Sequence, residues 1–193
     1  MKKEKIIDSS MLDEAIIFAT KAHEKTVRKG TKLPYIVHPI EAVAIVATMT
    51  DDQELLAAAA LHDVIEDTHY TYEDIKVKFG ERVANFVSQE SDEVYPDLPK
   101  EESWKIRKTH ALARLKSSSK ETKIIALGDK LSNMRAIYRD HKAEGESFWN
   151  RFNVKDPLEQ EWYYRGLKDS LSELNGTEAY KEFVELLEKV FNK

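Results

Sequence analysis

Four side chains that can bind a metal or move protons lie within residues 61–68, which read LHDVIEDT and follow the most apolar run of the chain. His62 and Asp63 are adjacent, and Glu66 and Asp67 come one helical turn later. If one helix continued through this stretch, Glu66 would lie on the same face as His62. Asp67 would then share a face with Asp63. Imidazole and carboxylate groups are ligands of divalent metals, so the stretch predicts one half of a hydrolytic metal site.

Two side chains elsewhere are candidates for the other half of this site. His38 stands at the expected start of a helix, and Asp129 interrupts the apolar run at residues 124–131. A single histidine at such a position is more often structural than a ligand. Asp129 has a structural alternative too, an internal ion pair with Lys130 or Arg135. The spacing of these residues alone does not choose between a metal site and structural roles.

The elements that position these residues are expected to be helices. Glycine and proline are scarce, at 6 and 5 residues, and apolar residues recur with a helical period, which predicts an all-α fold. The first expected helices are one capped by Ser9 or Ser10 that ends near Thr26, one that begins at Pro39 with His38 as its N-cap, and one that follows Asp51 or Asp52 and runs into His62-Asp63. The later ones are a short helix from the Thr71 capping signal to Phe79, a second short helix carrying Val83 and Phe86, two longer helices at 101–116 and 121–139, and a final amphipathic helix carrying Phe183 and Val190. The loops are expected at 27–37 and 89–100.

Length and composition exclude several classes of protein. A chain of 193 residues is expected to form a single domain, with a metal-site core over about 15–140 and further helices over 145–193. It has no cysteine, which excludes disulfides and thiolate metal sites and fits a cytoplasmic location. The net charge of −5 is mixed in sign along the chain, so no nucleic-acid partner is expected. Neither a signal peptide nor membrane association is expected, because Met1–Lys5 leads into no long apolar segment and no run reaches the ~18 apolar residues of a membrane span.

Several spaced motifs, in this order along the chain, resemble those of a known enzyme family. His38, the pair His62-Asp63 and Asp129 match the H…HD…D pattern of the HD superfamily of metal-dependent phosphohydrolases. More narrowly, the chain resembles the hydrolase domain of the RelA/SpoT family, whose members remove the 3′-pyrophosphate of the alarmone (p)ppGpp. The resemblance covers about residues 15–140. The motifs that carry it are Arg28-Lys29-Gly30, PYIVHP at 34–39, ALHDVIEDT at 60–68, Phe79-Gly80 and DKLSNMR at 129–135.

This resemblance implies an HD-type helical bundle that hydrolyses a small-molecule guanine nucleotide, releasing pyrophosphate and GDP or GTP. Mn²⁺ is the expected cofactor, since two imidazoles and two carboxylates form a borderline-hard site, and zinc is favoured less without thiolates. A synthetase domain is not expected, and neither is synthesis of the alarmone. The implied site residues are His38, His62, Asp63 and Asp129 for the metal, Glu66 and Asp67 for the attacking water and the leaving oxygen, and Arg28, Lys29, Lys130 and Asn133 for the substrate.

Three departures from the bifunctional members of the family keep other interpretations open. The loop between Lys29 and Pro34 is one residue longer, Ser132 stands where those members often carry histidine, and residues 88–92 differ from their usual sequence. One alternative is an HD phosphohydrolase that acts on another nucleotide or phosphate ester. The other is a nucleotide-binding HD module without catalysis, which the complete set of expected site residues disfavours. The oligomeric state is left undetermined.

Overall fold

Helices form nearly all of the regular structure. The computed structural model describes residues 8–91 and 95–192, and within these ranges the only β-type pairing is an isolated bridge between Val27 and Pro34. The predicted all-α class is therefore confirmed. The helices are α1 Ser10–Ala22, α2 Val37–Val46, α3 Gln53–Leu61, α4 Val64–Asp67, α5 Tyr72–Phe79, α6 Glu81–Glu90, α7 Lys100–Ser117, α8 Lys120–Glu144, α9 Pro157–Ser170 and α10 Glu178–Phe191, with 3₁₀ turns η1 Gly145–Arg151 and η2 Ser172–Leu174.

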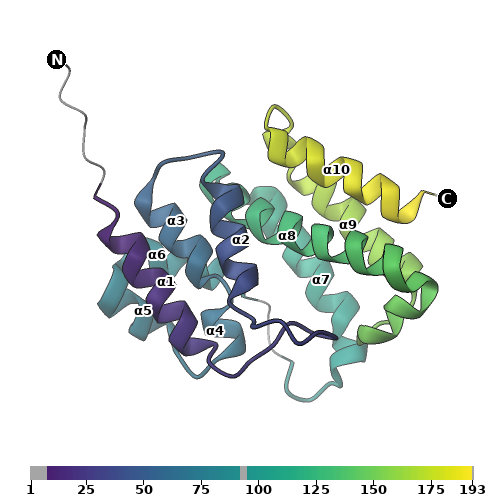
Figure 1. Ribbon diagram of the computed structural model, residues 1–193, viewed down its shortest axis with the longest axis horizontal. Coiled ribbons are helices and arrows are strands. Elements are labelled where there is room, and N and C mark those ends of the chain that lie inside the picture. The colour runs from purple at the N-terminus through teal and green to yellow at the C-terminus, as the bar shows by residue number, and fades with distance from the viewer. Residues whose placement is uncertain (1–7, 92–94, 193) are drawn as a thin grey trace.

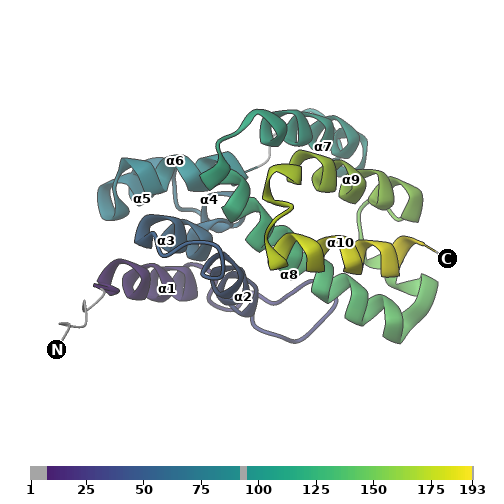
Figure 2. The ribbon, with the colours of Figure 1, turned by 90° about the horizontal axis from the view of Figure 1, so that it is seen from above.

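The long helix α8 joins the two halves of the bundle. Figure 1 shows α1 to α6 on one side and α9 and α10 on the other, with α8 running between them. Helices α2 and α10 both pack on α8, whereas α7 packs on α9. In the view from above (Figure 2), α10 lies alongside α8 and α9 lies beyond it, next to α7. A residue on α8 can therefore contact residues from both halves of the bundle.

Two of the expected helix caps, Asp52 and Thr71, form, whereas Ser9 precedes α1 without a capping hydrogen bond from its side chain. The Asp52 side chain accepts a hydrogen bond from the Glu54 backbone N–H and caps α3 at 2.9 Å. Thr71 and Asp74 form a reciprocal capping box at α5. Ser119 caps α8 by accepting from the Thr122 backbone N–H. These side chains satisfy backbone donors that no helical carbonyl can reach, which sets where each helix begins.

The core is built around α3. This helix contacts α1, α2, α6 and α8, and every residue from Leu55 to Leu61 is buried. Four of these residues are alanines, at 57–60, and each is at most 2% exposed. Small side chains let the surrounding helices approach closely, so the most apolar run of the chain becomes the centre of the bundle. His62 follows directly and is therefore held inside the protein.

Helices α2 and α8 approach each other at a glycine. A Cβ added at Gly128 would lie 2.6 Å from Val46 Cγ2 and 3.0 Å from the Ala42 carbonyl oxygen, both on α2. The absence of a side chain at Gly128 therefore permits this close approach. Asp129 is the next residue, so the same contact sets how near its carboxylate comes to α2.

The predicted role of His38 as an N-cap is wrong. Helix α2 begins at Val37, with Ile36 as its N-cap, and His38 lies inside the first turn. Pro39 fits there as the third helical residue, because backbone N–H groups in the first turn need no partner within the helix. His38 thus uses its side chain for other contacts and does not cap the helix.

Several other boundaries differ from expectation. The first helix ends at Ala22 rather than near Thr26, and Lys25 adopts a φ of 67° in the turn that follows. Helix α3 stops at Leu61, so the helix does not continue through residues 61–68 as one element. The loop expected at 89–100 is shorter, because α6 extends to Glu90 and α7 begins at Lys100; within it, residues 92–94 lie outside the described part of the chain.

Two further expectations concern the C-terminal helices and the absence of a membrane-spanning segment. Helix α8 runs on to Glu144, beyond the expected end at 139, and the final amphipathic helix is confirmed as α10. The N-terminal segment Met1–Lys5 lies outside the described residues. Across 8–91 and 95–192, no helix combines the length and apolar character required to cross a bilayer.

Candidate metal centre

Histidine and aspartate side chains from three separate helical segments meet at one point in the bundle. His38 comes from α2, His62 from the end of α3 and Asp129 from α8, and one donor atom from each lies within 4.8 Å of the other two. The residues are 3%, 1% and 5% exposed, respectively. Asp63 adds a fourth donor, since its Oδ2 lies 2.9 Å from His62 Nε2 and 3.5 Å from His38 Nε2. All four predicted metal ligands are thus brought together.

The spacing of the donor atoms fits a single divalent ion. His38 Nε2 lies 3.1 Å from Asp129 Oδ1 and 3.2 Å from His62 Nε2. Donors bound at about 2.1 Å and at right angles around one ion are about 3 Å apart. His62 Nδ1 lies 2.8 Å from the Ala59 carbonyl oxygen, which only accepts, so Nδ1 carries a proton and Nε2 is the nitrogen that faces the cluster. The donor set and its geometry therefore fit a first-row divalent metal ion.

Without a metal, the negative charge of the cluster is balanced by protons and by one lysine. Burial opposes a charge on His62, but the carboxylates of Asp63 and Asp129 outweigh burial and raise the pKa of His62 to about 10. Burial likewise favours neutral Asp63, but the charge and hydrogen bond of His62 hold its pKa below the usual range. Positive charge is thus favoured where the donor atoms converge.

Asp129 also forms the ion pair that was its structural alternative. Its Oδ2 accepts a short hydrogen bond from Lys130 Nζ, while its Oδ1 faces His38. Burial disfavours both charges, yet their attraction lowers the pKa of Asp129 and raises that of Lys130. The second alternative partner, Arg135, instead pairs with Glu41 and Glu182. Pairing with Lys130 leaves one carboxylate oxygen of Asp129 in the cluster.

Tyr35 fixes the outer side of Asp63. Its hydroxyl donates a 2.6 Å hydrogen bond to Asp63 Oδ2. Burial, followed by the charge of Asp63, raises the pKa of Tyr35 above its usual value, so the phenol keeps its proton and remains a donor. Asp67 also interacts with this hydroxyl. Sequence reasoning missed this role of Tyr35, although the residue lies within the PYIVHP motif that carries the resemblance.

The two acids predicted to act on water lie at the end of α4, next to the cluster. Glu66 and Asp67 are both solvent-exposed, unlike the four clustered residues. Although Asp67 as a whole is exposed, partial burial of its carboxyl group and the charge of Asp63 raise the pKa of Asp67 above its usual value. The backbone N–H of Asp67 bonds to the Asp63 carbonyl at 2.9 Å, so the acid is held one turn after the predicted ligand. This placement leaves both carboxylates accessible to a substrate and to water.

A cavity of about 250 Å³ opens beside His38. Arg28 and Asn133 line it, and the Arg28 guanidinium donates a 2.7 Å hydrogen bond to Asn133 Oδ1. Asn133 Nδ2 in turn donates to Asp129 Oδ1 at 2.5 Å, which links the cavity wall to the cluster. Other lining residues include Lys29, Thr31, Glu41, Ser132, Arg139, Asp140, Phe148, Arg151, Phe152 and Tyr164.

Lys130 is placed apart from the other predicted substrate residues. Arg28, Lys29 and Asn133 line the cavity beside His38, whereas Lys130 lines a smaller, separate cavity with Glu90. Its ammonium group is committed to Asp129. The structure therefore brings three of the four predicted substrate residues to one wall.

Comparison with known proteins gives the class of this chain. Residues 15–152 match the HD domain family. The match covers most of the chain, including the motifs that supply the clustered histidines and aspartates. The chain therefore belongs to the HD domain family.

Individual proteins that are similar to this chain point to one group of hydrolases within the HD domain family. The chain is 33% identical over 178 residues to guanosine-3′,5′-bis(diphosphate) 3′-pyrophosphohydrolase MESH1 of Xenopus tropicalis, covering 91% of this chain and 90% of that one. It is 34% identical over 133 residues to guanosine-3′,5′-bis(diphosphate) 3′-pyrophosphohydrolase of Aquifex aeolicus, covering 68% of this chain and 18% of that one. A solved structure described as a metazoan ortholog of SpoT that hydrolyzes ppGpp is similar with a TM-score of 0.77 and 25% identity, over 96% of this chain and 98% of that one. The resemblance to the RelA/SpoT hydrolases is confirmed.

Proposed function

We propose that this protein is a metal-dependent (p)ppGpp 3′-pyrophosphohydrolase that releases pyrophosphate and leaves GDP or GTP. The observation that carries the proposal is the hydrogen-bonded connection from Arg28 through Asn133 to Asp129, which joins the cavity of about 250 Å³ to the candidate metal cluster. The relatives named as 3′-pyrophosphohydrolases support the same reaction.

The proposed ligands are His38, His62, Asp63 and Asp129, and Mn²⁺ is the proposed ion. Two imidazoles with two carboxylates suit a first-row divalent ion that keeps open positions. When bound there, the ion supplies Lewis-acid polarisation of a phosphate oxygen and lowers the pKa of a coordinated water. Tyr35 would keep Asp63 in place through its 2.6 Å hydrogen bond.

Glu66 and Asp67 are proposed to handle the protons of the reaction. The oxygen of a water molecule forms a bond to the phosphorus attached to the ribose 3′ oxygen, and the bond between that phosphorus and the 3′ oxygen breaks. One carboxylate accepts a proton from the water, and a carboxylic acid returns a proton to the 3′ oxygen. Asp67 is proposed for the second role, because partial burial of its carboxyl group and the charge of Asp63 raise its pKa and so favour the protonated form.

Arg28 and Lys29 are proposed to bind the nucleoside end of the substrate, and Asn133 its ribose. A guanidinium can stack on a purine ring as well as pair with phosphate. Lys130 is proposed to act without contacting the nucleoside, by balancing the negative charge of Asp129 near the bound pyrophosphate. An amide that bonds both Arg28 and Asp129 would align the ribose with the clustered ligands.

A nucleotide panel with product analysis tests this function. Purified protein is incubated with Mn²⁺ and ppGpp, pppGpp, GDP, a nucleoside 3′-monophosphate and a simple phosphate ester. We expect pyrophosphate with GDP from ppGpp, and with GTP from pppGpp, at rates well above those for the other compounds. Faster turnover of another compound would support the alternative HD phosphohydrolase, and tight binding of ppGpp without any product would support a binding module.

A further inference from the structure

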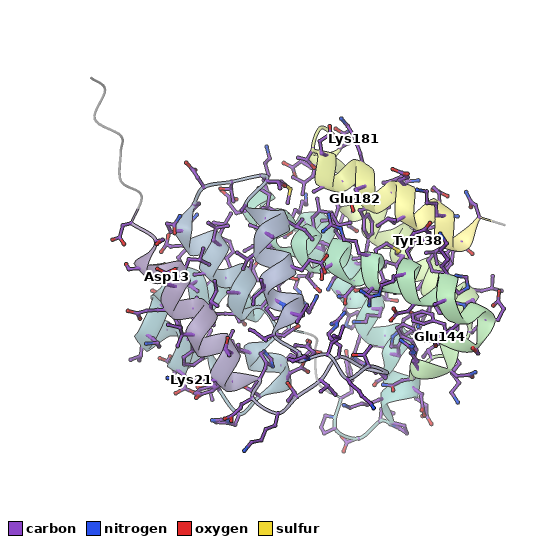
Figure 3. The ribbon with its side chains drawn as sticks, in the orientation of Figure 1. Asp13, Lys21, Tyr138, Glu144, Lys181 and Glu182 are labelled. Atoms are coloured by element: carbon purple, nitrogen blue, oxygen red, sulfur yellow. The ribbon has the colours of Figure 1, made fainter. Side chains whose placement is uncertain are left out.

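A continuous chain of hydrogen bonds leads from a proposed metal ligand to the C-terminal helix. His38 Nδ1 lies 2.8 Å from Ser132 Oγ on α8, and the Ser132 hydroxyl donates a 2.8 Å hydrogen bond to Glu41 Oε2 on α2. The other oxygen of Glu41 accepts from Arg135 at 3.1 Å. Arg135 also donates two 2.7 Å hydrogen bonds to Glu182, which Figure 3 labels on α10.

The direction of these hydrogen bonds determines the tautomer of His38. A hydroxyl group has one hydrogen, and the carboxylate oxygen Oε2 of Glu41 accepts it. Because the Ser132 hydrogen is directed at Glu41, its oxygen must accept the hydrogen bond from His38 Nδ1. Nδ1 therefore carries the proton, and Nε2 presents its lone pair toward His62 and Asp129.

The two proposed imidazole ligands are thus oriented in different ways. His62 Nδ1 is fixed by the Ala59 backbone carbonyl, which no side-chain substitution removes. His38 depends on the side chains of Ser132 and Glu41, which come from two different helices. Ser132 is 1% exposed, so water cannot readily replace its hydroxyl group. One of the two rings is therefore sensitive to substitutions outside the cluster.

We propose that Ser132 and Glu41 are positioning residues that fix the tautomer and orientation of the His38 ring for metal binding, and that Arg135 and Glu182 extend this control to α10. The inference rests on the proposed metal site but not on the identity of the substrate. It gives α10 a role in metal affinity, since Glu182 holds the guanidinium that holds Glu41. The effect should decrease outward along the chain, because Arg135, Glu41 and Glu182 have side chains that are 37%, 35% and 40% exposed.

The test measures the metal-free ring and the affinity for Mn²⁺ alone. Nitrogen-15 NMR of the metal-free protein reports which nitrogen of His38 carries the proton, and titration calorimetry with Mn²⁺ reports affinity. Ser132→Ala is expected to weaken Mn²⁺ binding by about 10–100-fold, as losing the hydrogen-bond partner of a ligating histidine does. It should also shift His38 away from the Nδ1-protonated form. Glu41→Gln should do the same to a smaller extent, and Glu182→Gln to the smallest.

Glu188→Gln is the matched control on the same helix. Glu188 pairs with Arg165 and Lys168 of α9, so its loss affects the packing of α10 without touching Arg135. Wild-type Mn²⁺ affinity in this control, combined with weaker binding in Glu182→Gln, supports the proposal. Thermal unfolding identifies any variant that fails to fold, in which case Glu41→Gln replaces Ser132→Ala as the deciding variant.

Specific outcomes overturn the proposal. Unchanged His38 nitrogen shifts and unchanged Mn²⁺ affinity in folded Ser132→Ala or Glu41→Gln contradict it, as does equal weakening by Glu182→Gln and Glu188→Gln. A wild-type protein that binds no divalent ion overturns the proposal together with the metal site. A wild-type protein that binds Mn²⁺ but does not cleave ppGpp contradicts only the proposed function, because neither readout requires a substrate.

Discussion

His38 Nε2 on α2 and Asp129 Oδ1 on α8 lie 3.1 Å apart, in a bundle where these two helices pack directly on each other. Gly128 permits this approach, because any side chain at that position would meet Val46 and the backbone of Ala42. The distance between two proposed metal ligands is therefore set by a residue that carries no functional group. Helix packing and site geometry can be tested together at this position.

Gly128→Ala is expected to destabilise the protein and weaken metal binding. The added Cβ would lie 2.6 Å from a branched side chain and 3.0 Å from a backbone oxygen, so α2 must shift. Overpacking of this kind costs about 1–3 kcal/mol of unfolding free energy. Chemical denaturation and Mn²⁺ titration measure the two effects.

Gly166→Ala is the control for this substitution. Gly166 is also helical, but its added Cβ would meet mainly the end of the flexible Leu112 side chain, at 2.5 Å from Cδ1. The gain in helix propensity, about 1 kcal/mol, should largely offset that contact. Equal loss of stability in the two variants would show that the α2–α8 contact has no special importance.

Glu66→Gln and Asp67→Asn are each expected to lower kcat for ppGpp by about 10²–10⁴-fold, the usual contribution of a general acid or base. Mn²⁺ affinity should stay within a few-fold of wild type, because both residues are exposed at the end of α4 and outside the donor cluster. Steady-state kinetics and Mn²⁺ titration separate the two effects. Glu73→Gln, an exposed acid on the neighbouring α5, should change neither. Full activity in both Glu66→Gln and Asp67→Asn would contradict their assigned role.

Arg28→Ala is expected to raise KM for ppGpp by at least about 10-fold, since it removes a charged hydrogen-bonding group worth about 1.5–3 kcal/mol. Asn133 would also lose the 2.7 Å hydrogen bond that positions it. Arg28→Lys should restore little, because an ammonium group neither stacks on a purine nor presents a planar fork. Lys32→Ala, at an exposed lysine of the same loop, is the control. Equal KM values for Arg28→Ala and Lys32→Ala would exclude a specific role for Arg28.

Glu90 is expected to make a pH-dependent contribution to the unfolding free energy of the metal-free protein. Burial is the main cause that raises its pKa from 4.5 to about 7. The folded state then binds the Glu90 proton more tightly than the unfolded state does, so the stability Glu90 contributes is complete below pH 4.5 and declines as the pH rises toward 7. Glu90→Gln should therefore gain stability relative to wild type between pH 5 and pH 8, by about 1–2 kcal/mol after allowance for partial exposure. Melting curves at the two pH values measure this, and a difference that does not change with pH would contradict it.

Most of the helices and two of their caps could be predicted from local sequence because their causes are local. Asp52 caps α3 and Thr71 caps α5 through contacts with residues two and three positions away. The N-cap role of His38 was predicted incorrectly. Proline is tolerated at any position of the first helical turn, so Pro39 does not show at which residue the helix begins. The end of helix α3 at Leu61 was also not predicted, because residues 61–68 contain no proline or glycine that would indicate a helix end.

Only part of the candidate site could be predicted from the sequence. The motif pattern indicated the four side chains that converge, but spacing alone did not. Sequence could not show that Tyr35 donates to Asp63 or that Ser132 joins His38 to Glu41, because both contacts depend on how separate helices pack. Lys130 was predicted beside the substrate, yet burial against Asp129 places it away from the cavity that Arg28 lines. Such contacts follow from tertiary packing.

The most direct test of the central claim is the release of pyrophosphate from ppGpp by wild-type protein and by Asp63→Ala, with Mn²⁺ present and after its removal by a chelator. Asp63 contributes Oδ2 to the donor cluster at 2.9 Å from His62 Nε2, so its loss removes one proposed ligand. We predict one pyrophosphate and one GDP per ppGpp from the wild type with Mn²⁺, and no release above background in the chelated protein or in Asp63→Ala. Pyrophosphate release that is undiminished in Asp63→Ala, or absent from the wild type with Mn²⁺, would contradict the account.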